Sequence, residues 1–211
     1  MRDHPWETIP LRDHEGHMGL EQVGQLQALN EMMEGQLEAY RASKVMILGI
    51  AGGNGLEHVR EGQFETIYGV DINASYLAAA ASRYPELAGV LECLRADLTE
   101  EPCPLPEADL LIADLLVEYI GCESFQRAVR RVRPRWVSCV IQIDTGEGWV
   151  SESPYLHVFD GLERVHRRVS GQALRQAMLA IGYQEAGTLA RGLPNGKELL
   201  RLDFERCARP G

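Results

Sequence analysis

The feature that most constrains this chain is an apolar run that passes directly into a glycine-rich loop. Residues 45–50 read Val-Met-Ile-Leu-Gly-Ile, and residues 51–55 read Ala-Gly-Gly-Asn-Gly. A short run of branched apolar side chains is typical of a buried strand. The glycines that follow allow the backbone to turn tightly and to approach a ligand closely. We expect residues 56–59 to begin a helix, whose free N–H groups favour polar or anionic ligand atoms.

A second apolar run, at residues 66–70, ends at Asp71, sixteen residues after Gly55. An acid at the tip of the neighbouring strand can accept hydrogen bonds from both hydroxyls of a ribose. The glycine loop and the spaced acid together predict a site for a ligand that contains a nucleoside. The alternative for the loop alone is a plain chain reversal, and the addition of Asp71 makes that interpretation weaker.

Composition narrows the class of protein. With 211 residues, 45% hydrophobic and 25% charged, the chain has the size and balance of a single globular domain. It contains no apolar run of membrane-spanning length and no apolar signal segment near Met1, so we expect a cytoplasmic protein without a membrane partner. The net charge of −10 makes nucleic acid an unlikely partner, and we expect a monomer or homodimer. Five scattered cysteines without a Cys-x-x-Cys pair predict reduced thiols and no metal site.

Apolar runs and helical patterns alternate from residue 45 onward, which predicts an α/β fold with a parallel sheet and helices on both faces. The expected strands are 45–50, 66–70, 90–95, 109–113 and 136–143, and the clearest intervening helices are 74–83 and 124–132. Before the first strand, apolar side chains at three- and four-residue steps predict one helix over 19–40.

The last third of the chain has a different pattern. Residues 145–168 show little periodicity, and Ser170 then predicts the N-cap of a helix that ends at Gly182. Two apolar runs follow at 183–189 and 198–204, joined by a segment that contains Asn-Gly. This dipeptide between apolar runs indicates a hairpin, so the sheet is expected to end in an antiparallel strand.

The whole arrangement over about residues 45–205 resembles the class I S-adenosylmethionine-dependent methyltransferases. The resemblance implies a doubly wound, mostly parallel, seven-stranded Rossmann-like sheet with a C-terminal antiparallel hairpin strand. It also implies an N-terminal helical cap at 1–44, within a single domain whose methyltransferase part is 45–211. In that family the first strand ends in an acid followed by Gly-x-Gly-x-Gly. The loop residues implied to contact the cofactor here are Gly49 in place of the acid, Ala51 in place of the first glycine, Gly52, Gly53, Asn54 and Gly55.

The same resemblance assigns roles to residues that follow the next two strands. Asp71 matches the ribose-binding acid, and Ile72 would pack on the face of the adenine. Asp97 and Leu98 match the site at the edge of the adenine, where a carboxylate accepts from the exocyclic amine and a backbone N–H donates to a ring nitrogen. The strand tips of such folds lie along one ligand-binding edge of the sheet.

Asp114 and Leu115 follow the fourth strand and match the place where the sulfonium and the substrate meet. The alternative for Asp97 and Asp114, each taken alone, is an ordinary turn-forming residue at a strand end. Their joint spacing with the glycine loop favours the functional interpretation.

Methyl transfer from a sulfonium needs alignment and exclusion of water, so a catalytic triad is not expected. Glu118 and Tyr119 are the candidate groups on the substrate side, although Tyr119 could simply pack and Glu118 could face solvent. The irregular segment 149–168 offers His157 and His166 as proton acceptors. For either histidine, a surface or merely hydrogen-bonded role is the more common alternative.

The sequence therefore predicts an enzyme that transfers a methyl group from S-adenosyl-L-methionine to an unknown, small-molecule acceptor. The first alternative is a non-catalytic module that keeps the fold and the adenosyl ligand for regulation, which Gly49 in place of the acid slightly favours. The second is an NAD(P)-dependent oxidoreductase, whose loop would read Gly-x-Gly-x-x-Gly. We also expect residues 14–40 and 145–168 to form a mobile cover over the acceptor pocket.

Overall fold

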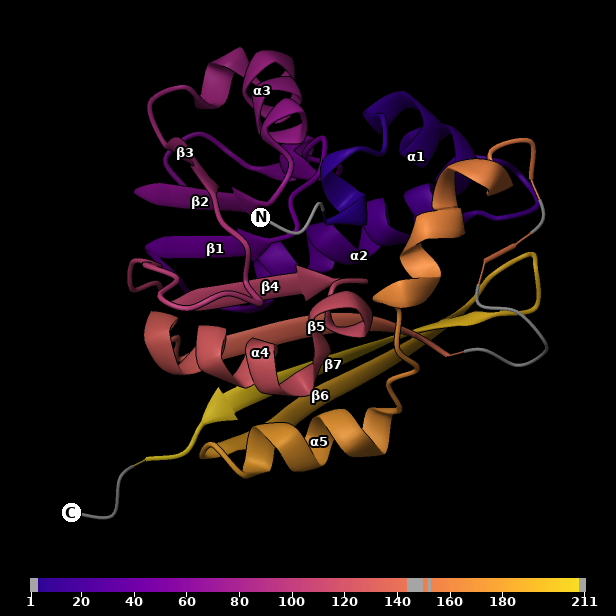
Figure 1. Ribbon diagram of the computed structural model, residues 1–211. Coiled ribbons are helices and arrows are strands. Elements are labelled where there is room, and N and C mark those ends of the chain that lie inside the picture. Colours follow the sequence, from indigo (N-terminus) through magenta and orange to yellow (C-terminus); the bar gives the residue numbers. More distant parts are fainter. Residues whose placement is uncertain (1–3, 144–149, 152, 209–211) are drawn as a thin grey trace.

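One sheet forms the centre of the molecule, and helices alternate with its strands along the chain (Figure 1). The computed structural model describes residues 4–143, 150–151 and 153–208. The strands are β1 (Lys44–Leu48), β2 (Thr66–Asp71), β3 (Leu91–Arg95), β4 (Leu110–Asp114), β5 (Trp136–Ile143), β6 (Tyr183–Gly192) and β7 (Glu198–Arg206). The α-helices are α1 (Leu11–Met18), α2 (Gln25–Ala39), α3 (Ala74–Arg83), α4 (Val117–Val132) and α5 (Gly171–Leu179). Shorter 3-10 helices are η1 (Pro5–Glu7), η2 (Leu56–His58), η3 (Pro85–Leu87) and η4 (Leu156–Arg164).

The strand order is β3-β2-β1-β4-β5-β7-β6, and β7 runs antiparallel to both of its neighbours. The pairs from β3 through to β5 are parallel, so their carboxyl ends lie along the same edge. The predicted doubly wound sheet with a closing antiparallel hairpin is therefore confirmed. The strand order changes direction between β1 and β4, which is where ligands bind in open α/β sheets.

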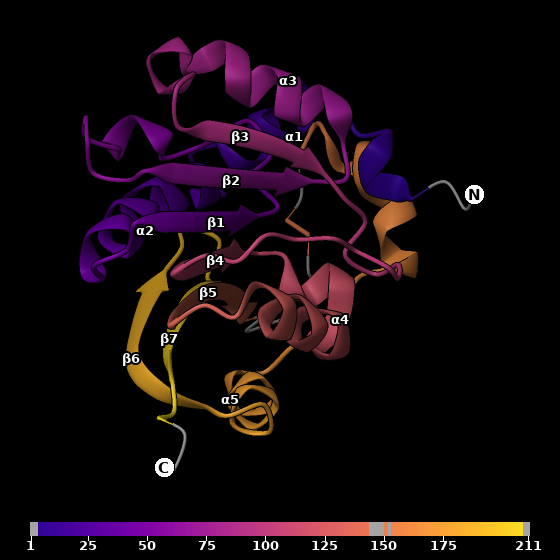
Figure 2. The ribbon, with the colours of Figure 1, turned by 90° about the vertical axis from the view of Figure 1, so that its left-hand side faces the viewer.

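Both faces of the sheet are buried because successive side chains of a strand point to opposite sides. Val45 and Ile47 of β1 join a core with α2 and α3, whereas Met46 and Leu48 join a core with α4 and α5. Figure 2 shows α2 on one side of the sheet and α4 with α5 on the other. The near-continuous apolar run of β1 is the sequence signature of a strand that is buried on both faces.

One helix prediction is wrong and another starts too early. The helix expected over 19–40 is α2, which begins only at Gln25 because residues 19–24 form a turn in which Gly24 adopts a left-handed conformation with φ of 66°; α1, before residue 19, was not predicted. The helix expected to begin at 56–59 is only the three-residue η2. Met33 and Leu37 of α2 pack against Leu56, so α2 already covers this part of the sheet.

The remaining expectations agree with the structure to within a few residues at most element ends. The α3 helix covers exactly the predicted 74–83, whereas α4 begins at Val117, seven residues earlier than expected, with a kink at Gly121. Ser170 caps α5 by accepting the N–H of Ala173 over 3.1 Å. The hairpin turn between β6 and β7 contains Gly196 with φ of 79°, as the Asn-Gly pair predicted.

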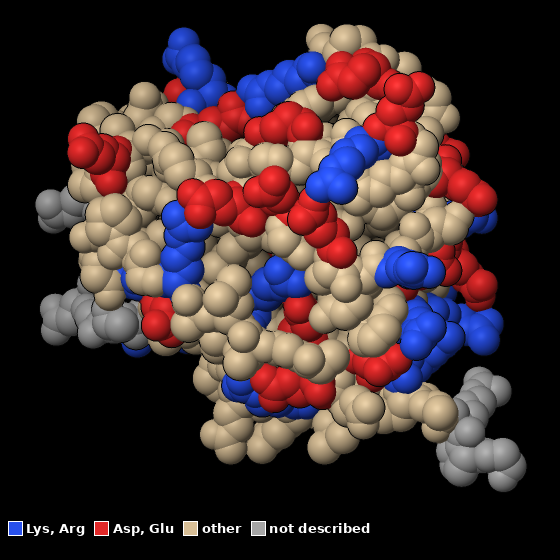
Figure 3. All heavy atoms as spheres, turned by 180° about the vertical axis from the view of Figure 1, so that it is seen from behind, with Lys and Arg blue, Asp and Glu red and all other residues tan. Residues whose placement is uncertain are grey.

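The surface mixes charges of both signs. On the face shown in Figure 3, acidic and basic side chains lie next to one another. Among the ion pairs of the structure, Glu31 and Glu38 of α2 pair with Arg191 and Arg60. Within the described residues, no helix combines the length and apolar character needed to cross a membrane. The same part of the chain holds no group of three potential metal ligands.

Candidate functional site

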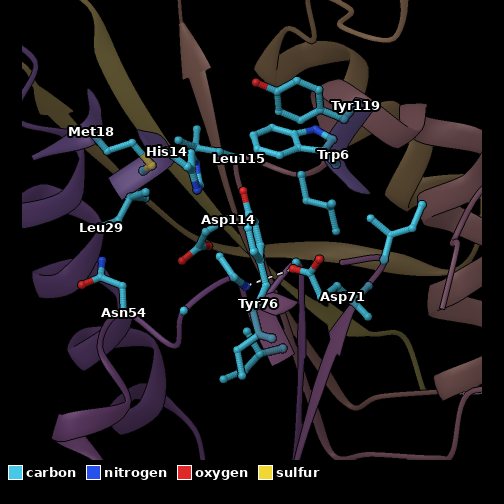
Figure 4. A pocket seen from close by; sticks show the side chains of 18 of the residues that line it. Trp6, His14, Met18, Leu29, Asn54, Asp71, Tyr76, Asp114, Leu115 and Tyr119 are labelled. Atoms are coloured by element: carbon cyan, nitrogen blue, oxygen red, sulfur yellow. Dashed lines mark hydrogen bonds between the residues drawn. The ribbon is translucent and has the colours of Figure 1, made fainter. Parts of the chain in front are cut away.

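A cavity of about 200 Å³ lies at the carboxyl ends of β1, β2 and β4 (Figure 4). Eleven of the twelve residues that the family resemblance assigned to the cofactor line it: Gly49, Ala51, Gly52, Gly53, Asn54, Asp71, Ile72, Asp97, Leu98, Asp114 and Leu115. Gly55 is not among the lining residues, and a Cβ there would come within 2.6 Å of Met33 on α2. The role of Gly55 is therefore to let the loop pass close to α2.

The glycine loop owes its shape to left-handed backbone conformations. Gly49 and Gly53 have φ of 71° and 81°, and Ala51 adopts φ of 47° although it carries a Cβ. This conformation is costly for alanine. The N–H of Ala51 donates to Asp71 Oδ2 over 3.0 Å, which holds the loop against the end of β2.

Asp71 is fixed from a second side as well. Its Oδ1 accepts the N–H of Asn73 over 2.9 Å, and the Asn73 side chain donates to the backbone oxygen of Trp6 over 2.8 Å. Only 9% of Asp71 is exposed, and burial raises the pKa of its carboxyl despite these hydrogen bonds. The predicted ribose acid is thus oriented by the loop and linked to the N-terminal segment, a connection that sequence reasoning missed.

Asp97 forms the turn that was its alternative interpretation, and it also lies at the cavity. Its Oδ1 accepts the N–H and the hydroxyl of Thr99 over 2.8 and 2.6 Å, which is the turn-forming role. The same residue lines the cavity together with Leu98. The turn therefore holds the carboxylate at the cavity wall.

Asp114 lies at the centre of the cavity, at the end of β4 (Figure 4). Its Oδ1 accepts a hydrogen bond of 2.8 Å from the side chain of Gln36, a fully buried residue of α2. Its Oδ2 is buried and has no hydrogen-bond partner in the structure. Burial, which is the largest cause, raises the pKa of Asp114 to about 7.

A buried polar network supports Gln36. Its amide nitrogen also donates to Ser138 Oγ over 3.0 Å, and the Ser138 hydroxyl donates to Asp203 Oδ1 over 2.5 Å. Arg201 forms two hydrogen bonds to the Asp203 carboxylate, of 2.9 and 2.7 Å, and the Tyr40 hydroxyl donates to the same group. These hydrogen bonds hold Gln36, Ser138 and Asp203 in one arrangement, while Gln36 Oε1 is buried without a partner.

The N-terminal segment closes the cavity from above. Glu15 of α1 pairs with Arg83 of α3, and Arg83 also donates to the backbone oxygen of Gly52 over 3.2 Å. A Cβ at Gly52 would collide with both charged side chains. This glycine therefore lets α1 lie directly on the loop.

Aromatic rings form the wall beneath this segment. Trp6 packs edge-on against His14 and Tyr119, with ring centroids 5.1 and 5.0 Å apart, and His14 lies parallel to Tyr76 at 6.0 Å. Burial lowers the pKa of His14 to about 4, so its imidazole is neutral at physiological pH. His14 Nδ1 and Tyr76 Oη are buried without a hydrogen-bond partner, and both residues line the cavity. Buried polar atoms of this kind are where a ligand or water is expected.

The catalytic candidates divide into two groups. Glu118, Tyr119 and His166 line the cavity, and His166 packs edge-on against Tyr119 at 5.6 Å. Glu118 is 3% exposed and accepts the N–H of Gln142 over 2.8 Å, so the solvent-facing alternative for it is wrong. His157 is exposed and is not among the lining residues.

The predicted cover lies partly in the described chain. Val150, Ser151 and Phe159 line the cavity from the segment before α5, and His17 and Met18 do so from α1. Trp149 falls outside the described residues. The α1 residues that line the cavity begin at His14, as the predicted cover does, and His4 and Trp6 line it from before that segment.

Comparison with known proteins identifies the fold and the domain. Residues 47–134 match a family model described as a methyltransferase domain. A search of curated protein sequences gives no match. Among solved structures, magnesium protoporphyrin IX methyltransferase from Synechocystis PCC 6803 is similar at a TM-score of 0.67 and 13% identity, covering 95% of this chain and 96% of that one.

Two further structures show how widely the fold is used. The methyltransferase domain of the bacterial protein CtHen1-C has a TM-score of 0.65 at 18% identity, covering 86% of this chain and 98% of that one. The [4+2]-cyclase SpnF has a TM-score of 0.64 at 11% identity, and the match covers 86% of this chain and 81% of that one. At these low sequence identities, the structural similarity shows only that the fold is shared. The match to the family model is the separate evidence for a methyltransferase domain. Residues 47–134 thus match a methyltransferase domain, and the chain has the fold of the class I S-adenosylmethionine-dependent methyltransferases.

Proposed function

We propose that this protein transfers the methyl group of S-adenosyl-L-methionine to a small-molecule acceptor held in the same cavity. The observation that carries the proposal is the continuity of the cavity. It joins the glycine loop, Asp71 and Asp97 to Asp114 and to a wall of aromatic side chains. A nucleoside cofactor and an acceptor thus have adjoining places at the strand tips.

The residues present fit the cofactor. Asp71 would accept from the ribose hydroxyls, Asp97 and the N–H of Leu98 would meet the adenine edge, and Gly49 would lie beside the methionine part. When bound, S-adenosyl-L-methionine supplies an electrophilic methyl group on a sulfonium. Among the described residues that line the cavity there is no lysine or arginine, whereas acids are present. This balance suits a cationic ligand.

The same balance disfavours the dinucleotide alternative. NAD would place two phosphates near the loop, where cations or a helix N-terminus usually meet them. Here the loop leads only into the short η2, and the lining of the described residues offers no cationic side chain.

A small acceptor is supported by side chains that line the cavity from two separate segments. Trp6, His14 and Glu15 come from the N-terminal segment, and Phe159 and His166 come from the segment before α5. These side chains would offer contacts to an acceptor of small size. Magnesium protoporphyrin IX methyltransferase, one of the similar structures, is itself named for a small-molecule substrate.

The test is to search for the methylated product in two fractions of a cell extract. Purified protein is incubated with methyl-labelled S-adenosyl-L-methionine and with either the low-molecular-mass or the macromolecular fraction. We expect label to enter the low-mass fraction, with S-adenosylhomocysteine formed in equal amount. The Asp71→Ala variant serves as the inactive control. Label found only in macromolecules would contradict the small-molecule acceptor, and binding without any transfer would favour the regulatory module.

A further inference from the structure

We propose that the acceptor is an amine, and that its nitrogen hydrogen-bonds to Asp114 Oδ2 and gives up its proton to that oxygen. This inference rests on the proposed methyl transfer and specifies its substrate class. It starts from an unusual atom: Asp114 Oδ2 is buried without a partner at the centre of a cavity that a ligand must fill.

The strand order places Asp114 at the reacting end of the site. Asp97 follows β3, Asp71 ends β2, and the glycine loop follows β1. The next strand in the sheet is β4, whose Ala113 pairs with Leu48, so Asp114 lies beside Gly49. A ligand with its adenine near β3 and its ribose at β2 therefore extends toward β4, where Asp114 would meet the methyl group and the acceptor.

The buried network decides which oxygen of Asp114 can carry a proton. The Asp203 carboxylate accepts two hydrogen bonds from Arg201, and the hydroxyl of Ser138 donates to its Oδ1. Ser138 then accepts from the amide of Gln36, whose nitrogen also donates to Asp114 Oδ1. Since Oδ1 is held as an acceptor, a proton on Asp114 must reside on Oδ2, the oxygen without a protein partner. Gln36 is thus a positioning residue for this carboxylate.

Charge and aromatic character favour an amine over an anionic nucleophile. A phenolate, thiolate or carboxylate would enter a cavity in which no described lining residue is lysine or arginine and in which Asp114 would repel it. An amine instead matches a cavity lined by a carboxylate and by aromatic rings such as those of Trp6 and Tyr119. During methyl transfer the positive charge would pass from sulfur to nitrogen, beside the Asp114 carboxylate.

The proposed step balances. The lone pair of the amine nitrogen forms the new N–C bond to the methyl carbon, and the C–S bond breaks with its electron pair staying on sulfur. The sulfonium becomes a thioether, and the nitrogen becomes a methylated ammonium. Its proton then passes to Asp114 Oδ2, which leaves a neutral methylated amine and a carboxylic acid.

The surroundings of Asp114 make it a suitable proton acceptor near neutral pH. Burial raises the pKa of its carboxyl to about 7, against the opposing effects of the Gln36 hydrogen bond and of Arg201. The other titratable groups facing it are Asp203 on β7, which adds to the rise, and the thiol of Cys139 on β5, whose own pKa is raised by burial.

The test uses sinefungin, a cofactor analogue with an amine-bearing carbon in place of the methylated sulfonium. We expect wild-type protein at pH 8 to bind sinefungin at least roughly tenfold more tightly than S-adenosylhomocysteine, as a charge-assisted hydrogen bond would give. In Asp114→Asn, which keeps an acceptor for Gln36, the preference should vanish while the affinity for S-adenosylhomocysteine stays within about threefold. Gln36→Leu should weaken the preference for sinefungin over S-adenosylhomocysteine and should shift the pH dependence of that preference.

Each other result has a distinct meaning. If Asp114→Asn weakens both ligands equally, the carboxylate holds the methionine part, and the inference is overturned. Equal affinity of wild-type protein for the two ligands would also overturn it. If neither ligand binds to the folded protein, the proposed function itself fails. A matched acceptor set of 2-phenylethylamine, 2-phenylethanol and 3-phenylpropionic acid then checks the class, because methyl transfer to the alcohol or acid but not the amine would contradict it.

Discussion

The backbone N–H of Ala51 donates to the Asp71 carboxylate over 3.0 Å, so the shape of the glycine loop and the orientation of this carboxylate depend on each other. Ala51 needs this support because its φ of 47° is unfavourable for a residue with a Cβ. The interaction also joins the tips of β1 and β2, the two strands on which the proposed cofactor site is built.

Replacement of Asp71 by alanine should therefore affect binding and stability together. We expect the affinity for S-adenosylhomocysteine to fall by about 1.5–3 kcal/mol, since bonds to a charged acceptor are lost. The free energy of unfolding should also fall by about 1–3 kcal/mol, because the N–H groups of Ala51 and Asn73 lose their partner. Calorimetry and urea unfolding measure the two effects. Unchanged affinity would reduce Asp71 to a residue that only shapes the loop.

Gly53 offers a test of the loop with a matched control. Its φ is 81°, and a Cβ would come within 2.9 Å of Leu56 and Tyr84, so larger side chains there disturb packing as well as backbone. Gly62 has a similar φ of 73° with nothing within 4 Å of a Cβ. Gly53→Ala should destabilise the protein by about 1–3 kcal/mol more than Gly62→Ala and should weaken ligand binding.

Only Gly53→Ala is expected to change the affinity for S-adenosylhomocysteine, because Gly62 does not line the cavity. Equal effects of the two substitutions on stability and binding would show that the left-handed backbone alone matters. That result would contradict close packing of the loop.

The pH dependence of stability should reveal Asp114. Its pKa is about 7 in the folded protein and near the ordinary aspartate value in the unfolded chain. Between these values the folded state binds the extra proton, so Asp114 lowers the free energy of unfolding as pH rises from about 4 to about 7. The Asp114→Asn substitution should remove this decrease in the free energy of unfolding, which amounts to at most about 4 kcal/mol.

The measurement is urea unfolding of the ligand-free wild type and variant at pH 5 and pH 8. The stability of Asp114→Asn relative to wild type should increase at the higher pH. A difference that is the same at both pH values would mean that Asp114 has an ordinary pKa, and a difference of opposite sign would mean that its carboxylate is stabilised in the folded protein.

The N-terminal segment and the segment before α5 should respond to the cofactor. Trp6 and His14 cover the cavity from one side and Phe159 from the other, so a bound ligand would gain contacts with both segments. Hydrogen exchange with S-adenosylhomocysteine should show increased protection at residues 11–40 and 150–168, as well as at 49–55 and 71. Equal exchange of both covering segments in the free and bound states would argue against a ligand-coupled cover.

The strands, α3 and the hairpin could be predicted because each has a local pattern. The run 45–50, the helical spacing of 74–83 and the Asn-Gly turn specify their structures within a few residues. The same holds for the strand-tip residues Asp71 and Asp114, since parallel strands bring their carboxyl ends together.

The contacts that complete the site could not be read in this way. Gln36 meets Asp114 from 78 positions away, and Asn73 meets Trp6 from 67 positions away, so neither pair has a local signature. One signal was available: Gln36 is a polar residue between Met33 and Leu37 on the apolar stripe of its helix. A buried amide at such a position needs partners, and that points to a polar network.

Isothermal calorimetry with S-adenosylhomocysteine and with NAD tests the central claim most directly. A cavity whose described lining has acids but no lysine or arginine should accept the adenosyl ligand and reject the two phosphates of NAD. We predict saturable binding of S-adenosylhomocysteine and affinity for NAD at least about a hundredfold weaker, a difference of about 2.7 kcal/mol. Binding of NAD with equal or higher affinity, or no binding of the adenosyl ligand to folded protein, would contradict the account.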